Sequence, residues 1–291
     1  MMHKELVVVT GKGGVGKSTV AAALGTAAAR HRRTLVLEVD PRENVHQMLG
    51  TPPSGGELVG VAPNLWLQNL RPMEVVDRII RDRVPLEAVV RRVLSSTVYR
   101  HFAQGAPGLK ETAILAHALE IVTRKVRGAP EIDLVILDAP ATGHSLSLLT
   151  APKLVVEAIE RGPVAELTRR VSDWVASAAK TGVVVVTVAE EMPVSEALEL
   201  IAALDERLSR DPDLVVVNQL YPALPAGFRA RDPVGKLWRR RRELNDDELA
   251  RLGASWTGPI AELPLLPLDR GPDLVDELAR DLGAWLEGVP A

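Results

Sequence analysis

The sequence predicts an α/β fold in which helices flank a mostly parallel sheet. Five short runs rich in valine, isoleucine and leucine recur along the chain, and helical patterns separate them. Because these runs are apolar on both faces, they are typical of parallel strands that helices cover on both sides. The runs are residues 5–9, 34–39, 132–138, 182–188 and 213–218.

One stretch interrupts the alternation. Between residues 72 and 128 at least two helical patterns follow each other with no strand run between them, and a further helical piece at 152–181 precedes the fourth run. Short connections flank both pieces, which argues against a separately folded domain. We therefore expect one domain over residues 1–291, with a helical subdomain of residues 72–128 and 152–181 inserted at one edge of the sheet.

Composition excludes several classes of protein. The net charge of −3 gives no general attraction to nucleic acid or anionic lipid. The absence of cysteine excludes disulfides and thiolate metal sites, and the six histidines show no ligand-like spacing. No apolar stretch reaches the roughly 20 residues of a spanning helix, and a strand pattern begins at once after the N-terminus. We expect a cytoplasmic protein that neither binds nucleic acid nor inserts into a membrane.

A phosphate-binding pattern follows the first run. Residues 11–19, GKGGVGKST, contain G-x-x-x-x-G-K-[ST] between a strand and a helix, the context that a P-loop NTPase requires. Glycines allow backbone N–H groups to surround a phosphate, and Lys17 is expected to reach the β- and γ-phosphates while the Ser18 hydroxyl binds Mg²⁺. The expected contacts to the nucleotide in this loop are Gly11, Lys12, Gly13, Gly14, Val15, Gly16, Lys17, Ser18 and Thr19.

The second lysine of the loop, Lys12, restricts the sequence to one group of P-loop NTPases. K-G-G-V-G-K-[ST] resembles the deviant P-loop of the nitrogenase iron protein, the partitioning and division-site ATPases, and the arsenical-pump and tail-anchored-protein targeting ATPases. In those families this lysine contacts the nucleotide of the partner subunit. The resemblance implies a homodimer in which Lys12 acts in trans on charge that develops during phosphoryl transfer. The alternative is a solvated lysine on a loop.

Residues 40–44, DPREN, favour the arsenical-pump and targeting branch. They resemble its switch I, D-P-A-H-N, in which Asp40 matches the aspartate that orients the attacking water. The alternative interpretation is an N-cap for the helix that follows. Arg42 and Glu43 replace the usual small residue and histidine, a departure expected to change the rate of hydrolysis without abolishing it.

The run at 132–138 is followed by APATGHSLSLL, which resembles the switch II segment D-T-A-P-T-G-H of the same branch. An aspartate that ends a buried strand beside a P-loop can hold Mg²⁺ through water, and Asp138 is expected to do so. Gly143 could let the backbone change conformation, and a capping role for His144 is as well supported as a direct one. The expected metal-site residues are Ser18, Asp40 and Asp138.

Two later segments point to the base of ATP. Residues 215–222, VVVNQLYP, resemble a segment in which an asparagine recognises adenine, and Asn218 occupies that position. Residues 262–271 resemble the loop that closes over the base, with Pro264 and Leu265 as contacts. Either segment is also consistent with an ordinary strand end or turn. The matches, which include P-G-x-x-E within residues 106–111, extend from about residue 5 to 270.

The resemblance implies an ATPase that hydrolyses ATP with Mg²⁺ as a nucleotide-gated homodimer, with Lys12, Lys17 and Asp40 as catalytic residues. A hydrophobic protein client is a candidate partner, because apolar residues at helical spacing could line a groove. Such residues are more often plain core, and the chain has only five methionines. The residues in question are Val75, Val76, Ile79, Ile80, Val89, Val90, Val93 and Leu94.

The lack of cysteine distinguishes this sequence from two members of the families that it resembles. The arsenical pump binds arsenite through thiolates, and the eukaryotic targeting ATPase holds its dimer with zinc on paired C-x-x-C motifs, so both features require cysteine.

The alternative function is a positioning or partitioning ATPase whose output is binding to membrane or DNA. The mainly acidic polar face of the C-terminal amphipathic segment and the lack of a basic face argue against that alternative.

Overall fold

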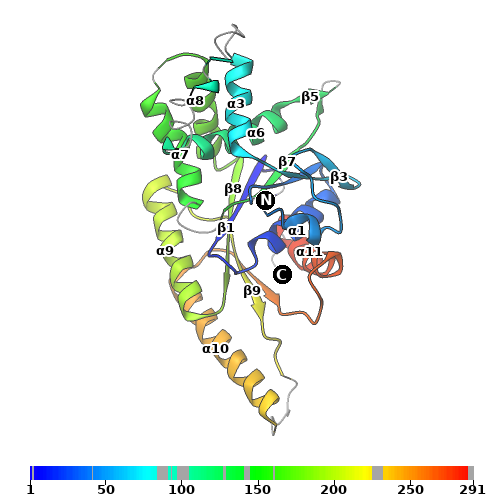
Figure 1. The fold of residues 1–291 in the computed structure, drawn as a ribbon. Coiled ribbons are helices and arrows are strands. Elements are labelled where there is room, and N and C mark those ends of the chain that lie inside the picture. The colour runs from blue at the N-terminus through cyan, green and yellow to red at the C-terminus, as the bar shows by residue number, and fades with distance from the viewer. Residues whose placement is uncertain are drawn as a thin grey trace.

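An eight-stranded sheet forms the centre of the molecule in the computed structural model (Figure 1). The strand order is β10-β9-β8-β1-β7-β2-β4-β3, in which only β3 runs antiparallel to its neighbour within this sheet. Its strands are β1 (Leu6–Gly11), β2 (Thr34–Glu38), β3 (Val59–Ala62), β4 (Leu65–Asn69), β7 (Leu134–Asp138), β8 (Thr181–Val188), β9 (Leu214–Leu220) and β10 (Ile260–Pro264). A separate small ribbon pairs β5 (Lys125–Val126) with β6 (Ala129–Pro130).

The structure describes most of the chain. The described residues are 1, 3–40, 42–83, 91–92, 94–96, 105–126, 129–140, 145–159, 161–224 and 232–287. Within them the helices are α1 (Lys17–Ala29), α2 (Val45–Met48), α3 (Pro72–Arg83), α6 (Leu109–Thr123), α7 (Ser145–Ala158), α8 (Pro163–Ala176), α9 (Glu191–Leu208), α10 (Pro233–Ser255) and α11 (Pro272–Glu287).

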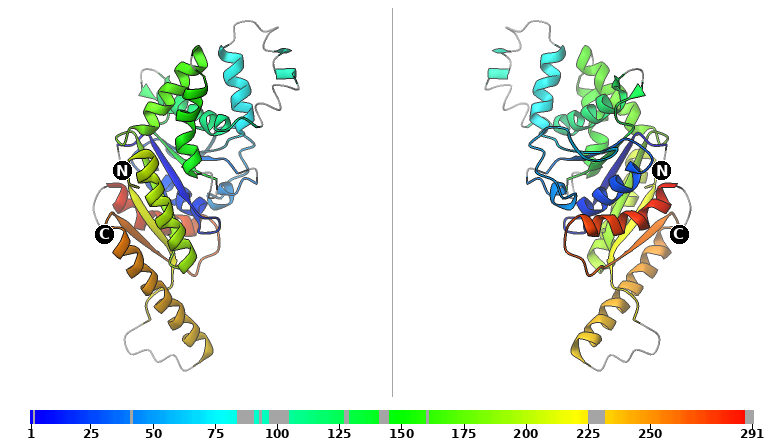
Figure 2. Two further views of the ribbon diagram at one scale, coloured as in Figure 1. Left: turned by 90° about the vertical axis from the view of Figure 1, so that its left-hand side faces the viewer. Right: turned by 90° about the vertical axis from the view of Figure 1, so that its right-hand side faces the viewer.

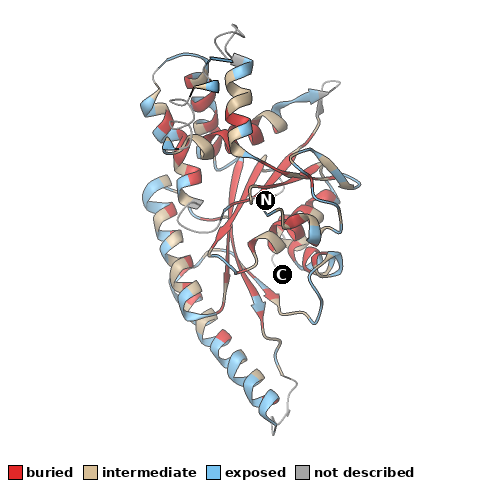
Figure 3. Cartoon of the chain, viewed as in Figure 1, coloured by how far each residue is buried: buried red, intermediate tan, exposed pale blue. Residues whose placement is uncertain are grey.

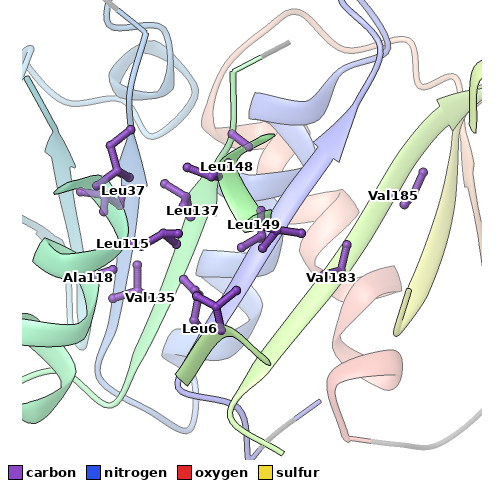
Figure 4. Close-up of a cluster of buried hydrophobic side chains, with 14 of the residues drawn as sticks. Leu6, Leu37, Leu115, Ala118, Val135, Leu137, Leu148, Leu149, Val183 and Val185 are labelled. Atoms are coloured by element: carbon purple, nitrogen blue, oxygen red, sulfur yellow. The ribbon is translucent and has the colours of Figure 1, made fainter. Parts of the chain in front are cut away.

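The predicted α/β class is confirmed, and each of the five apolar runs overlaps one strand of the sheet. Alternate residues of these strands face opposite layers, which explains why the runs are apolar throughout. Leu6 and Val8 of β1 belong to the core on the side of α6, α8 and α9, whereas Val7 and Val9 belong to the core beneath α1 and α11. Figure 4 shows Leu6 among side chains of the first core.

Three strands of the eight-stranded sheet were not predicted. β3 and β4 extend the sheet beyond β2, and β10 forms the opposite edge. In β4 buried residues alternate with partly buried ones, and β10 shows a similar alternation, so neither carries the continuous apolar run that marks the central strands. Residues 262–264 of the segment expected to cover the base belong to β10.

Four helices, α3, α6, α7 and α8, pack together at one end of the sheet, at the top of Figure 1. They enclose an apolar cavity of about 230 Å³, to which α3 contributes Val76, Ile79 and Ile80. These helices lie largely within the two pieces predicted as a helical subdomain, although α7 begins at Ser145, before residue 152. Val89, Val90 and Val93 of the predicted apolar set lie outside the described residues.

Helix α10 projects from the other end of the molecule, as both views in Figure 2 show. Its first half is mostly exposed, in pale blue in Figure 3. Arg240 pairs with Glu243, and Arg242 with Asp246, along the helix. Of the helices in the described part of the chain, none is long and apolar enough to cross a membrane.

A buried histidine ties α3 and α6 to the sheet. Arg78 on α3 donates to Nδ1 of His117 on α6 at 2.8 Å, and the other ring nitrogen, Nε2, donates to Oε1 of Gln68 on β4 at 2.8 Å. Because a guanidinium has no acceptor, Nδ1 must be unprotonated and the ring neutral. Burial and the charge of Arg78 lower the pKa of His117 to about 4. The carboxylate of Glu120 pairs with Arg78 at 3.3 Å.

This lowered pKa predicts a pH-dependent contribution to stability. The unfolded chain binds a proton at His117 near the ordinary pKa of 6.5, whereas the folded chain does so only near 4. The neutral His117 therefore contributes its full share to the free energy of unfolding above pH 6.5, and this contribution is lost as the pH falls towards 4. Replacing His117 by Gln removes the titration, so the difference in unfolding free energy between wild type and His117→Gln should shrink by about 2 kcal/mol from pH 7.5 to 4.5. Denaturant melts at both pH values measure it, and a constant difference would contradict the neutral histidine.

Candidate functional site

The loop between β1 and α1 depends on three glycines with positive φ. Gly11 has a φ of 143°, and a Cβ on it would lie 2.1 Å from the carbonyl oxygen of Val186 on β8. Gly16 has a φ of 91°, and a Cβ there would lie 2.3 Å from Nδ2 of Asn218 on β9. Gly14 has a φ of 87° but faces open space. The loop thus combines left-handed backbone with close approach to two neighbouring strands, which only glycine permits at residues 11 and 16.

Lys17, at the start of α1, is already directed into the loop. Its Nζ donates to the carbonyl oxygen of Lys12 at 2.9 Å, and the residue is only 8% exposed. Burial lowers the pKa of Lys17, while the charges of Asp138 and Asp40 oppose this effect. The ammonium group is therefore held in a water-poor loop beside two carboxylates, a placement suited to the oxygens of a phosphate.

Asp138 ends β7 next to β1, where it is opposite Val9 in the strand register. Burial raises the pKa of Asp138 to about 7, although a hydrogen bond from Ser18 acts in the opposite direction. Its Oδ1 is buried and has no hydrogen-bond partner among the described residues. A buried carboxylate oxygen without a partner, beside a serine hydroxyl, matches the hard oxygen ligands that Mg²⁺ prefers. The residues present therefore fit the expected metal.

A second buried carboxylate, Glu38, was missed by the sequence analysis. It ends β2 opposite Asp138 in the register and is 1% exposed. Burial raises the pKa of Glu38, but its Oε1 accepts hydrogen bonds from the backbone N–H of Asn44 at 2.6 Å and Val45 at 3.2 Å. The signal was present in the sequence, because a glutamate inside an otherwise apolar strand run is an unusual residue to bury.

Asp40 follows β2 at the same edge of the sheet. Its Oδ1 accepts a hydrogen bond from the N–H of Arg42 at 2.8 Å and lies 3.6 Å from Nε of that residue. The N-cap position of α2 is occupied by Asn44, so Asp40 does not cap this helix. Asp40 therefore belongs to a turn beside the buried carboxylates Glu38 and Asp138, whose pKa values its charge raises.

The side chain of Lys12 lies away from its own loop. Its Nζ forms an ion pair with Oε1 of Glu196 on α9 at 2.6 Å, and both side chains are about one-third exposed. Only the backbone carbonyl of Lys12 faces the loop interior, where it accepts the hydrogen bond from Lys17. Glu196 is a second functional candidate that the sequence analysis did not identify, since the contact joins residues far apart in the chain.

The residues expected to bind the base lie at the ends of β9 and β10. Asn218 is 4% exposed, and its Nδ2 donates to the carbonyl oxygen of Val15 at 3.0 Å, so this side chain supports the loop directly. Pro264 pairs with Leu220, to whose carbonyl oxygen the N–H of Leu265 donates at 2.7 Å.

Next to Asn218, the exposed Gln219 has a φ of 60° and lines a hollow of about 630 Å³ together with Gly14, Tyr221 and Leu265. Sequence reasoning singled out Asn218 and passed over this second carboxamide. The described residues end before Ala141 and resume at Ser145, so Gly143 and His144 of the predicted switch II lie outside them.

Comparison with known proteins identifies the family. Residues 4–162, more than half of the chain, match the family described as anion-transporting ATPase. The chain therefore belongs to the anion-transporting ATPase family, and by membership it is classed among ATPases.

Relatives include ATPase BagA of Mycobacterium tuberculosis, 30% identical over 233 residues that make up 75% of this chain and 66% of that protein. ATPase ASNA1 homolog 1 of Paramecium tetraurelia is 26% identical over 53% of this chain and 46% of its own. ATPase GET3C of Arabidopsis thaliana is 26% identical over 55% of this chain and 44% of its own. The chain thus spans just under two thirds of the first relative and less than half of the others.

Two glycines of the loop give a matched test of this geometry. Gly16→Ala adds strain at positive φ and a clash with Asn218, whereas Gly14→Ala adds the strain alone. We expect Gly16→Ala to lower the unfolding free energy by about 1–3 kcal/mol more than Gly14→Ala does. Thermal and denaturant melts of both variants measure it. The double variant Gly16→Ala/Asn218→Ala should recover part of the loss, and no recovery would show that the contact with Asn218 is not the cause.

Proposed function

We propose that the chain binds ATP with Mg²⁺ at the loop of residues 11–19 and hydrolyses it as a nucleotide-gated homodimer. The observation that carries this proposal is the buried Lys17, which points into the glycine loop beside the unpartnered oxygen of Asp138. Groups of both signs are thereby concentrated where the β- and γ-phosphates of a P-loop ligand lie: the positive α1 N-terminus and Lys17, and the carboxylates of Glu38 and Asp138 at the ends of β2 and β7.

Each residue has a distinct role in this proposal. Lys17 and the loop N–H groups stabilise negative charge on the phosphates, and Ser18 and Asp138 hold Mg²⁺. The metal, when bound, neutralises phosphate charge. Asp40 orients the attacking water after its carboxylate leaves the N–H of Arg42. The Arg42 side chain, whose Nε lies 3.6 Å from Oδ1 of Asp40, adds an ion pair that this reorientation must break.

The base of the nucleotide is proposed to lie against the ends of β9 and β10. Pro264 and Leu265 provide an apolar contact, and Asn218 provides a carboxamide that can donate and accept as adenine requires. Because Nδ2 of Asn218 donates to Val15, recognition of adenine by this group is linked to the conformation of the phosphate loop.

A homodimer in which Lys12 acts in trans is supported by the position of its side chain. The ammonium group is outside its own loop and close enough to α9 to pair with Glu196. The pair is partly exposed, so its free energy is small and a nucleotide phosphate of a partner subunit can compete for the lysine. Hydrolysis would then require two subunits to face each other.

A hydrophobic protein client is proposed as the partner of the helices α3, α6, α7 and α8. The apolar pocket that they line supports this, because its lining is almost entirely of apolar side chains, which can bury apolar groups of a partner. The net charge of −3 does not favour nucleic acid as a partner.

Replacement of Lys17 tests nucleotide binding. Lys17→Ala removes the buried ammonium group of the loop, so both ATP affinity and turnover should fall, affinity by about 10²-fold or more. Isothermal titration with ATP and magnesium, alongside a phosphate-release assay, measures the two quantities. Lys180→Ala, which replaces an exposed lysine paired with Glu5, is the control and should behave as wild type. ATP affinity that stays at the wild-type value in Lys17→Ala would overturn the assignment.

Replacement of Lys12 tests the dimeric mechanism. Lys12→Ala keeps Lys17 and the loop N–H groups, so ATP should still bind, whereas turnover should fall by about 10³-fold, as when an arginine finger is removed. Mixing Lys12→Ala with Asp40→Asn should restore part of the activity, because one site of each heterodimer then has its own Asp40 and the partner's Lys12.

Size-exclusion chromatography with and without ATP checks that the subunits exchange. Inactive heterodimers, or full turnover by Lys12→Ala alone, would show that Lys12 does not act across an interface.

A further inference from the structure

The last two residues of β4 connect the Asp40 turn to the helical end of the molecule. Asn69, which is 4% exposed, donates through Nδ2 to the carbonyl oxygen of Asp40 at 2.6 Å and to Oε2 of Glu38 at 3.4 Å. The peptide that carries the Asp40 side chain is therefore held by a buried side chain of a neighbouring strand. A shift of β4 would move this peptide directly.

The loop before β3 joins the same two residues of β4. Ser54 accepts through Oγ from the N–H of Asn69 at 2.8 Å, and the carbonyl oxygen of Gly56 accepts from Nε2 of Gln68 at 2.8 Å. The N–H of Gly55 in this loop donates to Oε2 of Glu43, which lies in the turn after Asp40, at 3.3 Å. Residues 54–56 therefore contact both the end of β4 and the segment that follows Asp40.

His117 holds the other side of Gln68. The amide nitrogen of Gln68 donates to Gly56 and its oxygen accepts from Nε2 of His117 at 2.8 Å, so the two contacts together fix which way the amide is turned. Arg78 in turn fixes the ring from α3 at 2.8 Å. His117 is buried and Gln68 is partly buried, so loss of this hydrogen bond would leave a buried donor unsatisfied, and the helices thereby help to orient the Gln68 amide.

The same pair of side chains sets the separation of α3 and α6. Arg78 lies between residues of α3 that line the apolar cavity, and His117 directly follows Ala116, which lines it from α6. The Arg78–His117 contact therefore joins two helices that also contribute side chains to the apolar cavity. Movement of α3 relative to α6 cannot occur without changing the donor presented to Gln68.

We propose that His117 is a positioning residue for ATP hydrolysis, which holds the peptide of Asp40 through Gln68, the 54–56 loop and Asn69. This inference rests on the role proposed for Asp40. It assigns to a residue far from the phosphate loop a specific effect: turnover depends on His117, whereas binding of ATP, which uses the loop of residues 11–19, does not. It also gives the helical end a physical route by which its packing alters hydrolysis.

The test compares turnover and KM for ATP in three variants. His117→Leu removes both hydrogen bonds and keeps an apolar side chain, so kcat should fall about tenfold while KM changes less than about twofold. His117→Gln keeps one acceptor and one donor and should recover most of the rate. Thr181→Val is the matched control, because Thr181 is also buried and its hydroxyl donates to the carbonyl oxygen of Trp174, a hydrogen bond that lies outside the chain of contacts from His117 to Asp40. This control should retain the wild-type kcat.

A double variant separates positioning from general loss of stability. If Gln68 and His117 act in series, Gln68→Met/His117→Leu should be no slower than the slower single variant, whereas independent effects would multiply. Gln68→Met alone, on the strand, gives the same expected loss of kcat and carries the test if His117→Leu does not fold. Wild-type kcat in folded His117→Leu, equal rates for His117→Leu and His117→Gln, or multiplied losses in the double variant would each overturn the inference.

Asp40→Asn in the same assay distinguishes this inference from the proposed function. If Asp40→Asn retains turnover, the proposed role of Asp40 fails and the route from His117 has no endpoint. If Asp40→Asn is inactive and folded His117→Leu retains full kcat, the proposed function stands and only the role of His117 is wrong.

Discussion

Burial of opposite charges at the carboxyl ends of the central strands is the constraint on which the rest of the structure depends. Lys17 is 8% exposed and Asp138 is 6% exposed. Burial lowers the pKa of Lys17 and raises the pKa of Asp138, so it favours the neutral form of both groups. Neither group can be stabilised by bulk water there, so the loop carbonyl of Lys12, the Ser18 hydroxyl and an incoming ligand must do so. This burial is the physical basis of the proposal that a phosphate and a cation bind at these residues.

The sheet makes this arrangement possible through its register. β7 and β8 flank β1, which brings Asp138 beside the start of the loop on one side and the Val186 carbonyl against Gly11 on the other. β9 adds Asn218, whose amide holds Val15. The loop is consequently bounded by strands that are distant in sequence, and its shape depends on packing of the whole sheet as well as on its own glycines.

Polar contacts as well as apolar packing join the helical end to this edge of the sheet. Apolar side chains can exchange partners with little change in energy, whereas a buried chain of hydrogen bonds has one satisfied arrangement. The contacts of His117, Gln68 and Asn69 form such a chain. This is a physical reason for a polar histidine inside a layer that otherwise encloses an apolar cavity.

The sequence alone was sufficient for the α/β class, the five central strands and the glycine loop, because each rests on a local pattern: continuous apolar runs, and G-x-x-x-x-G-K-[ST] in its strand–helix context. It also singled out Lys17 and Asp138, which the structure brings together. Local patterns have less to say about β4 and β10, since exposure alternates along both strands, and they cannot show that the Nδ2 group of Asn218 already serves the loop.

Only the tertiary structure decided which partners the polar side chains have. Glu38 lies opposite Asp138, Glu196 pairs with Lys12, and His117 reaches Gln68 because strand order and helix packing join segments that are tens of residues or more apart. A side chain's charge and hydrogen-bonding capacity are fixed by its identity, but the group that satisfies it depends on distance in space. For this protein the sequence therefore determined the chemistry that is present, and the fold determined which groups act on one another.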